Sequence, residues 1–200
     1  MKYKVLIITF FLSMKVIFPS QEIVNDSNMT FEQSIKGTKA PQEVIDNLSL
    51  VNVSYYSTDS KLHRGQLLVA KDVKADVEHV FELILKEKFI VHKCVPIVKY
   101  NWSDDASMAD NNSSAFCYRT IAGTDRLSNH ALGRAVDINP MFNPVIDADK
   151  ITPAGGKYQT SRPGTLYENS PINIKFKELG WSWGGDFKSY KDYHHFDKRK

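Results

Sequence analysis

The sequence predicts one α+β domain of about 180 residues behind an export segment. Residues 50–56 alternate apolar and polar side chains with the period of a strand, and residues 66–70 form a compact apolar run. Residues 71–88 instead repeat apolar side chains at spacings of three and four, which is typical of a helix that buries one face. Because such strands and helices do not alternate regularly, the pattern favours α+β over a doubly wound sheet.

A polar arm is expected to precede the domain proper, which would span residues 41–200. Residues 21–40 include four consecutive polar residues and predict an extended or mobile arm. Pro41 favours the start of a helix over residues 42–48, because proline is tolerated in the first helical turn. After the strands and the helix described above, residues 89–98 predict a third strand.

The second half of the chain is richer in loops. Residues 101–114 are polar throughout and predict a long loop, a feature that is usually functional or mobile in a compact domain. Residues 143–166 are irregular and interrupted by proline and glycine, and a last helix over residues 171–179 ends at Gly180. Short strands are predicted over residues 116–121 and 135–138.

Residues 1–20 predict a secretory signal peptide. Lys2 and Lys4 precede an apolar run, and Ser20 supplies a small residue where cleavage is expected. A membrane anchor is the alternative, but Lys15 interrupts the run before it reaches the roughly 17–25 apolar residues of a spanning helix. We therefore expect an exported protein, periplasmic or extracellular, with no stable membrane insertion after cleavage.

Removal of the signal peptide makes the chain neutral. The whole chain has 26 Lys and Arg against 23 Asp and Glu, and three lysines lie within residues 1–20, so 23 basic and 23 acidic residues remain. A neutral chain has no electrostatic reason to bind nucleic acid or an anionic membrane. Neither is therefore expected as a partner.

The two cysteines leave their redox state open. In an oxidising compartment, Cys94 and Cys117 would close a loop with a disulfide worth about 3 kcal/mol. Two buried free thiols fit the sequence equally well, because free cysteine is among the most buried residue types.

Three of the six histidines lie in patterns that favour a metal site. Asp137 follows His130 by seven positions, and His194 and His195 lie near the carboxyl end. A catalytic zinc site uses three His or carboxylate ligands and keeps the fourth position for water, so two histidines and one aspartate would complete it. The remaining histidines stand alone and are expected to be exposed or hydrogen-bonded: His63, His79 and His92.

These residues also carry a family resemblance. The run Ser128-x-His130-x-x-Gly133-x-Ala135-x-Asp137, with the later Trp183-Gly184-Gly185-Asp186 and Asp192-x-x-His195-Phe196, resembles the zinc D-alanyl-D-alanine carboxypeptidase and L-alanyl-D-glutamate endopeptidase family of peptidoglycan-cleaving enzymes. The resemblance spans about residues 62–197. It implies the fold of the hedgehog signalling domains and D-Ala-D-Ala peptidases, a small antiparallel sheet with flanking helices around one zinc site.

The resemblance implies a role for each motif residue. Asp192 would act as general base on water. Arg119 would bind the substrate and stabilise the oxyanion of the tetrahedral intermediate. Ser128 and Asp186 are expected to contact the substrate or to orient the ligands. The family's Zn²⁺ ligands correspond here to His130, Asp137 and His195.

His194 competes with His195 for the ligand assignment, since the family often has proline at that position. We favour His195. Side chains at positions i and i+3 of a strand point to opposite faces, so Asp192 and His195 converge only if the chain turns before the strand begins. A strand that already began at Asp192 would put His194 on its face instead.

Together these features predict an exported zinc metallopeptidase that hydrolyses an amide bond in the peptide stem of bacterial peptidoglycan. Asp192, rather than Glu, before the last ligand resembles the endopeptidase branch, so we favour the L-Ala–D-Glu bond over the D-Ala–D-Ala bond. The alternative is a non-catalytic, zinc-stapled module that binds peptidoglycan or a protein. A purely structural zinc site would need a fourth protein ligand, for which His194 is the candidate.

Overall fold

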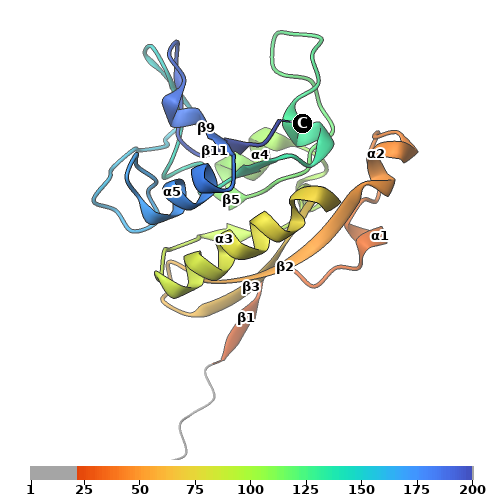
Figure 1. Ribbon diagram of the computed structural model, residues 1–200, viewed down its shortest axis with the longest axis horizontal. Coiled ribbons are helices and arrows are strands. Elements are labelled where there is room, and N and C mark those ends of the chain that lie inside the picture. Colours follow the sequence, from red (N-terminus) through yellow and green to blue (C-terminus); the bar gives the residue numbers. More distant parts are fainter. Residues whose placement is uncertain (1–21, 200) are drawn as a thin grey trace, which may run out of the picture.

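A computed structural model describes residues 22–199, in which small sheets combine with short helices (Figure 1). This mixture confirms the predicted α+β class. The predicted signal peptide lies outside the described residues. Within residues 22–199, no helix has both the length and the apolar content needed to cross a membrane.

The longest strands form a sheet in the first half of the domain. β2 (Leu48–Tyr56) and β3 (Leu62–Ala70) are antiparallel, with Leu48 opposite Ala70 and Tyr56 opposite Leu62. Both predicted strands are confirmed, and each begins earlier than the sequence pattern indicated. β1 (Ile23–Asn25) pairs in parallel with the other edge of β3.

α3 (Lys74–Lys86) lies across this sheet (Figure 1) and confirms the centre of the helix predicted over residues 71–88. A 3-10 turn, Lys71–Val73, replaces its first residues. The apolar side chains at helical spacing are buried in the main core, where each contributes about 1.5–3 kcal/mol by leaving water. They are Val77, Val80, Phe81 and Ile84.

Residues 21–40 are not the extended or mobile arm that the sequence predicts. α1 (Phe31–Ser34) begins at Thr30, whose side chain accepts a hydrogen bond from the Gln33 N–H. Phe31 packs on a second core cluster formed with Leu68 and Phe116. The polar residues that suggested an arm are used in caps and hydrogen bonds.

Asp26 fixes the start of this segment to the sheet. Its carboxylate accepts a hydrogen bond from the Tyr55 hydroxyl. Nδ1 of His63 lies 3.0 Å from each Asp26 carboxylate oxygen, and Nε2 lies 3.1 Å from Asp59. His63 is buried and fully hydrogen-bonded, which agrees with its expected structural role.

The predicted third strand is largely absent. Of residues 89–98, only β4 (Lys93–Cys94) is a strand, because Pro96 leads into a 3-10 turn over Ile97–Tyr100. The helix α2 (Gln42–Asp46) is also shorter than predicted, because β2 begins two residues after it ends.

The polar stretch over residues 101–114 is not a plain loop. Ser103 accepts a hydrogen bond from the Ala106 N–H and begins α4 (Asp104–Ala109). β5 (Asn112–Ser113) then pairs in parallel with β4. Ser103 therefore caps a helix that carries Asp104 and Asp105 in its first turn, which composition alone did not reveal.

The second half of the chain forms two further three-stranded sheets. β11 (His195–Asp197) lies between β6 (Ala135–Asp137) and β9 (Ser182–Trp183) and is antiparallel to both. β7 (Val145–Asp147) lies between its hairpin partner β8 (Lys150–Thr152) and β10 (Lys191–Asp192). The predicted strand over 135–138 and the helix over 171–179 are confirmed as β6 and α5 (Pro171–Glu178).

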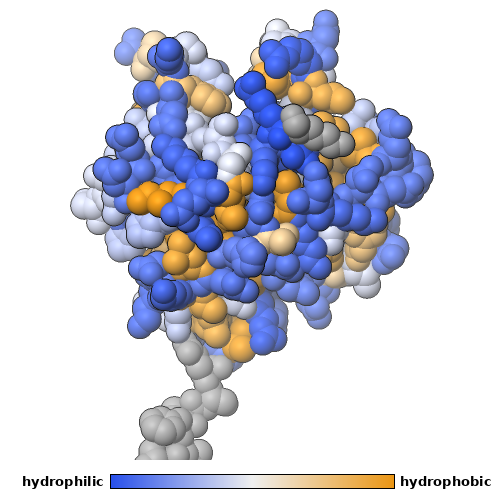
Figure 2. All heavy atoms as spheres, viewed as in Figure 1, coloured by the Kyte–Doolittle hydropathy of each residue, from blue (hydrophilic) through white to orange (hydrophobic). Residues whose placement is uncertain are grey.

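The strand predicted over residues 116–121 does not form. The Phe116 N–H donates to Leu68 and the Cys117 N–H donates to His130, so consecutive backbone groups bond to different segments. Residues 119–128 then form a narrow loop closed at its base by a bridge between Thr120 and Leu127. This loop and the β7–β8 hairpin project from the same side of the molecule (Figure 1), and Figure 2 shows a hollow between the projections.

Candidate metal centre

His130 is held in a 3-10 turn, Asn129–Leu132, that is fixed at both ends. Ser128 Oγ accepts the His130 N–H at 3.2 Å, and Gly133 ends the turn with φ of +67°. A Cβ at Gly133 would lie 2.7 Å from the Ala70 backbone nitrogen, so the turn requires glycine. The Ala70 N–H donates to the Gly133 carbonyl at 2.8 Å, which joins the turn to β3.

Asp137 and His195 come from neighbouring strands. They are directly opposite each other in the antiparallel pair of β6 and β11. Directly opposite residues share one face of a sheet, so both side chains point toward the same place. Strand pairing therefore brings together two residues that are far apart in the sequence.

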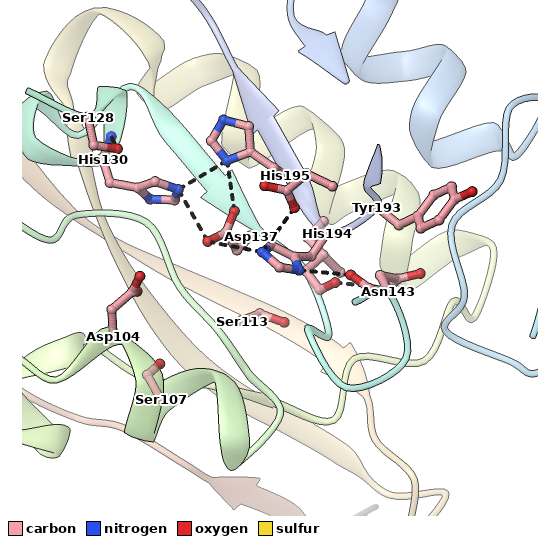
Figure 3. Close-up of polar contacts among 12 residues, drawn as sticks. Asp104, Ser107, Ser113, Ser128, His130, Asp137, Asn143, Tyr193, His194 and His195 are labelled. Atoms are coloured by element: carbon pink, nitrogen blue, oxygen red, sulfur yellow. Dashed lines mark hydrogen bonds and ion pairs between the residues drawn. The ribbon is translucent and has the colours of Figure 1, made fainter. Parts of the chain in front are cut away.

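The side chains of His130, Asp137 and His195 converge closely (Figure 3). His195 Nδ1 lies 3.0 Å from Asp137 Oδ1 and 3.2 Å from His130 Nε2, and His130 Nε2 lies 3.2 Å from Asp137 Oδ2. Ligands of a tetrahedral zinc ion at about 2.0–2.2 Å are separated from one another by about 3.3–3.6 Å, slightly more than the distances seen here. The spacing and the donor types of this cluster therefore fit zinc.

A backbone carbonyl on the Nδ1 side of the ring sets the orientation of His130. Its Nδ1 lies 2.5 Å from the Ala115 carbonyl oxygen. A carbonyl only accepts, so Nδ1 carries the proton and Nε2 offers its lone pair to the cluster. Ala115 has no functional side chain, so sequence patterns could not identify this contact.

The cluster is strongly coupled electrostatically. Burial favours the neutral form of Asp137, but the adjacent His130 and His194 hold the pKa of its carboxyl well below the usual value. Burial likewise opposes the charge on His195, but the hydrogen bond to Asp137 and the nearby carboxylate of Asp197 raise the pKa of its ring to about 10. Asp137 and His195 thus carry opposite charges, and a bound cation would take the place of the proton on His195.

The chain turns at residues 193–194, between β10 and β11, so the condition for Asp192 and His195 to converge is met. His194 is buried, and its Nδ1 lies 2.8 Å from the Asn143 carbonyl oxygen. Its Nε2 lies 3.1 Å from Asp192 Oδ1 and 3.9 Å from Asp137 Oδ2 (Figure 3). Within residues 22–199, the cluster with metal-ligand spacing contains His195 and not His194.

Asp192 has an unusual environment. Its Oδ1 is buried and has no hydrogen-bond partner among residues 22–199, because the His194 ring is near it without the required geometry. A buried carboxylate oxygen without a donor is costly unless a ligand or water supplies one. This oxygen of Asp192 is therefore available to a ligand or a water molecule.

Arg119 lies at the base of the loop over residues 119–128. Its guanidinium is 2.7 Å from Asp104, at the start of α4, and donates to the Thr120 carbonyl at 3.4 Å. Burial disfavours the charge, but Asp104 and Asp137 raise the pKa of Arg119. No sequence pattern singled out Asp104, since it occurs in a run of polar residues.

The other residues singled out in the sequence have local partners. Ser128 begins the turn that carries His130, and Asp186 forms an ion pair with Lys177 at 2.8 Å. Cys94 and Cys117 are free and buried, so of the two redox states left open, the structure has free thiols. Burial raises the pKa of Cys117 to about 11 and that of Cys94 well above its usual value.

Comparison with known proteins adds one finding. A family profile described as D-alanyl-D-alanine carboxypeptidase matches residues 122–198, a segment that contains the whole His/Asp/His cluster and Asp192. The chain resembles this zinc peptidase family. The matched segment is less than half of the chain, and it excludes the β2–β3 sheet, α3 and Arg119. No curated protein and no solved structure gives a significant match.

Proposed function

We propose that this chain is an exported zinc metallopeptidase that hydrolyses an amide bond in the peptide stem of peptidoglycan. The observation that carries the proposal is the preformed cluster of His130, Asp137 and His195, with donor separations of 3.0–3.2 Å, beside the unpartnered Asp192 oxygen. The match to a peptidase family over the same residues supports it. We further propose that the domain has the hedgehog and D-Ala-D-Ala peptidase-like fold.

The chemistry divides between the metal and the chain. When bound by the cluster, zinc polarises the scissile carbonyl and lowers the pKa of water toward neutrality. Asp192 takes the water proton and delivers it to the leaving amine. Arg119, oriented by Asp104, supplies a positive charge to the oxygen of the attacked carbonyl, an interaction typically worth about 3–4 kcal/mol.

We favour the L-Ala–D-Glu bond over the terminal D-Ala–D-Ala bond. A carboxypeptidase needs a cationic or donor-rich end to hold the free carboxylate of its substrate. Arg119 is assigned here to the oxygen of the attacked carbonyl and is held by Asp104 at 2.7 Å, so it is not free to serve as that end. Asp192, rather than Glu, in the terminal motif points in the same direction.

The rival function is a zinc-stapled module that binds peptidoglycan or a protein without cutting it. Such a module needs the metal ligands but no base. A binding module would not require the unpartnered Asp192 oxygen. His194 bonds to the Asn143 carbonyl and does not complete a four-ligand site. Both observations favour catalysis over binding alone.

The decisive experiment is digestion of purified peptidoglycan and of defined stem peptides, with zinc and with a chelator, and analysis of the products by mass. We expect metal-dependent cleavage that produces a new D-Glu amino terminus. Release of free D-alanine would instead identify a carboxypeptidase. Stoichiometric zinc binding without cleavage of either substrate would overturn the enzymatic proposal and favour the binding module.

A further inference from the structure

The imidazole of His195 lies between two carboxylates. Its Nδ1 is 3.0 Å from Asp137 Oδ1, and its Nε2 is 3.8 Å from Asp197 Oδ2. A neutral imidazole carries one N–H and one lone pair. For Nδ1 to donate its lone pair to a metal, the proton must reside on Nε2, on the side of Asp197.

The opposite tautomer of His195, with its proton on Nδ1, is also stabilised by the structure. A proton on Nδ1 would be shared with Asp137 at 3.0 Å, and it would block the nitrogen that belongs to the cluster. The sheet alone therefore does not select the ring state that binds a metal. A negative group near Nε2 is needed to favour the productive tautomer.

The carboxylate of Asp197 is placed to be the negative group near Nε2 of His195. It is buried and lies two positions after His195 on β11, so both side chains lie on the same face of the strand. Its Oδ2 accepts a hydrogen bond from Asn129 Nδ2 at 2.5 Å. Because Asn129 directly precedes His130, this bond joins the two segments that carry the histidine ligands.

We propose that Asp197, oriented by Asn129, is a positioning residue that sets the His195 ring to bind metal through Nδ1. At 3.8 Å the contact with Nε2 is too long for a hydrogen bond. It acts electrostatically, because the positive end of the Nε2–H bond faces a buried carboxylate. The inference rests on the proposed metal centre, but not on which bond is cleaved.

The test compares D197N with D76N by zinc competition against a chromophoric chelator. Loss of such an outer carboxylate typically weakens metal binding about 10–100-fold, and we expect this for D197N. Asp76 is a matched control, since it is another partly buried carboxylate, hydrogen-bonded to Trp181 and Lys198, with no contact to the cluster. D76N should lower stability yet keep the zinc affinity within about twofold, and D197E should recover part of the loss.

Equal zinc affinity in D197N and wild type would overturn the inference, as would a loss no greater than that of D76N. A second measurement does not depend on any variant folding. Long-range proton–nitrogen spectra of the zinc-loaded wild type should show His195 coordinated through Nδ1 and protonated at Nε2. Coordination through Nε2 would overturn the inference. If the wild type binds no zinc at all, the proposed function fails rather than this inference alone.

Discussion

His130 Nε2 and His195 Nδ1 lie 3.2 Å apart, although the two residues are 65 positions apart in the sequence. The first is carried by a short turn joined to β3, and the second by the central strand of another sheet. The His/Asp/His cluster is therefore a product of tertiary structure, and it forms only when β11 pairs with β6.

The adjacent histidines should differ in their effect on metal content. H195Q removes a donor of the cluster and should abolish stoichiometric zinc binding, because only one histidine and one carboxylate remain. H194Q should retain zinc, since this ring bonds to the Asn143 carbonyl. Metal analysis after gel filtration checks both, and zinc loss in H194Q with retention in H195Q would reverse the assignment.

Substitution of Asp192 should separate binding from catalysis. D192N keeps the three metal donors but cannot accept the water proton, so we expect unchanged zinc content and about 10²–10⁴-fold slower cleavage. D110N is the control, because Asp110 is also close to half exposed and is paired with Lys93, away from the cluster. Cleavage at the wild-type rate by D192N would remove this residue from the mechanism.

Zinc binding should release a proton from His195. Its pKa is raised to about 10, so the ring is protonated at pH 7 before zinc binds. Apparent zinc affinity should then rise with pH up to about pH 10, and calorimetry in buffers of different ionisation enthalpy should show about one proton released. The same raised pKa stabilises the zinc-free fold fully below about pH 6.5, and this contribution disappears as pH rises toward 10. A binding enthalpy independent of the buffer would contradict this linkage.

The thiols should be inert in the folded protein. Burial raises the pKa of Cys94 and Cys117, so little thiolate exists at pH 8. A thiol reagent should react slowly with the native chain and should detect both groups after unfolding in guanidinium. Detection of none in the unfolded, unreduced protein would demonstrate a disulfide.

Asp26 should be important for stability. D26A removes the acceptor of Tyr55 and the partner of buried His63, and we expect a loss of about 1–3 kcal/mol in the free energy of unfolding. D59A is matched, because Asp59 contacts the same ring from an exposed position, and its effect should be about 0–1 kcal/mol. Urea titration measures both, and equal losses would show that the amino-terminal strand is not held in this way.

Sequence patterns were most informative where side-chain periodicity reflects burial. β2, β3, α3 and α5 were predictable because their apolar residues recur at the period of the element. The errors fall in residues 21–40, 89–98 and 101–121, where serine and asparagine cap helices or bond distant backbone groups. Such polar residues look alike in caps and in loops, so composition could not separate them.

Part of the candidate site could likewise be predicted from the sequence, and part of it could not. His130, Asp137 and His195 were identified from motif spacing and a family resemblance, and the structure brings them together. Asp192 came from the same resemblance and lies against His194, and the roles of all four residues remain predictions. Asp197, Asn129 and Asp104 were missed, because their partners lie on segments remote in sequence. Only the pairing of β6 with β11 and the position of α4 reveal these contacts.

The closed base of the loop over residues 119–128 separates the tip of the loop from the turn that carries His130. Backbone hydrogen bonds join Ser128 to Arg119 at 3.1 Å and Ile121 to Arg126 at 2.8 Å, so the ends stay together whatever the tip contains. Residues 122–125 are exposed, and insertions there would not move the turn that carries His130. A different tip could thus be grafted onto this loop without moving the turn that carries His130.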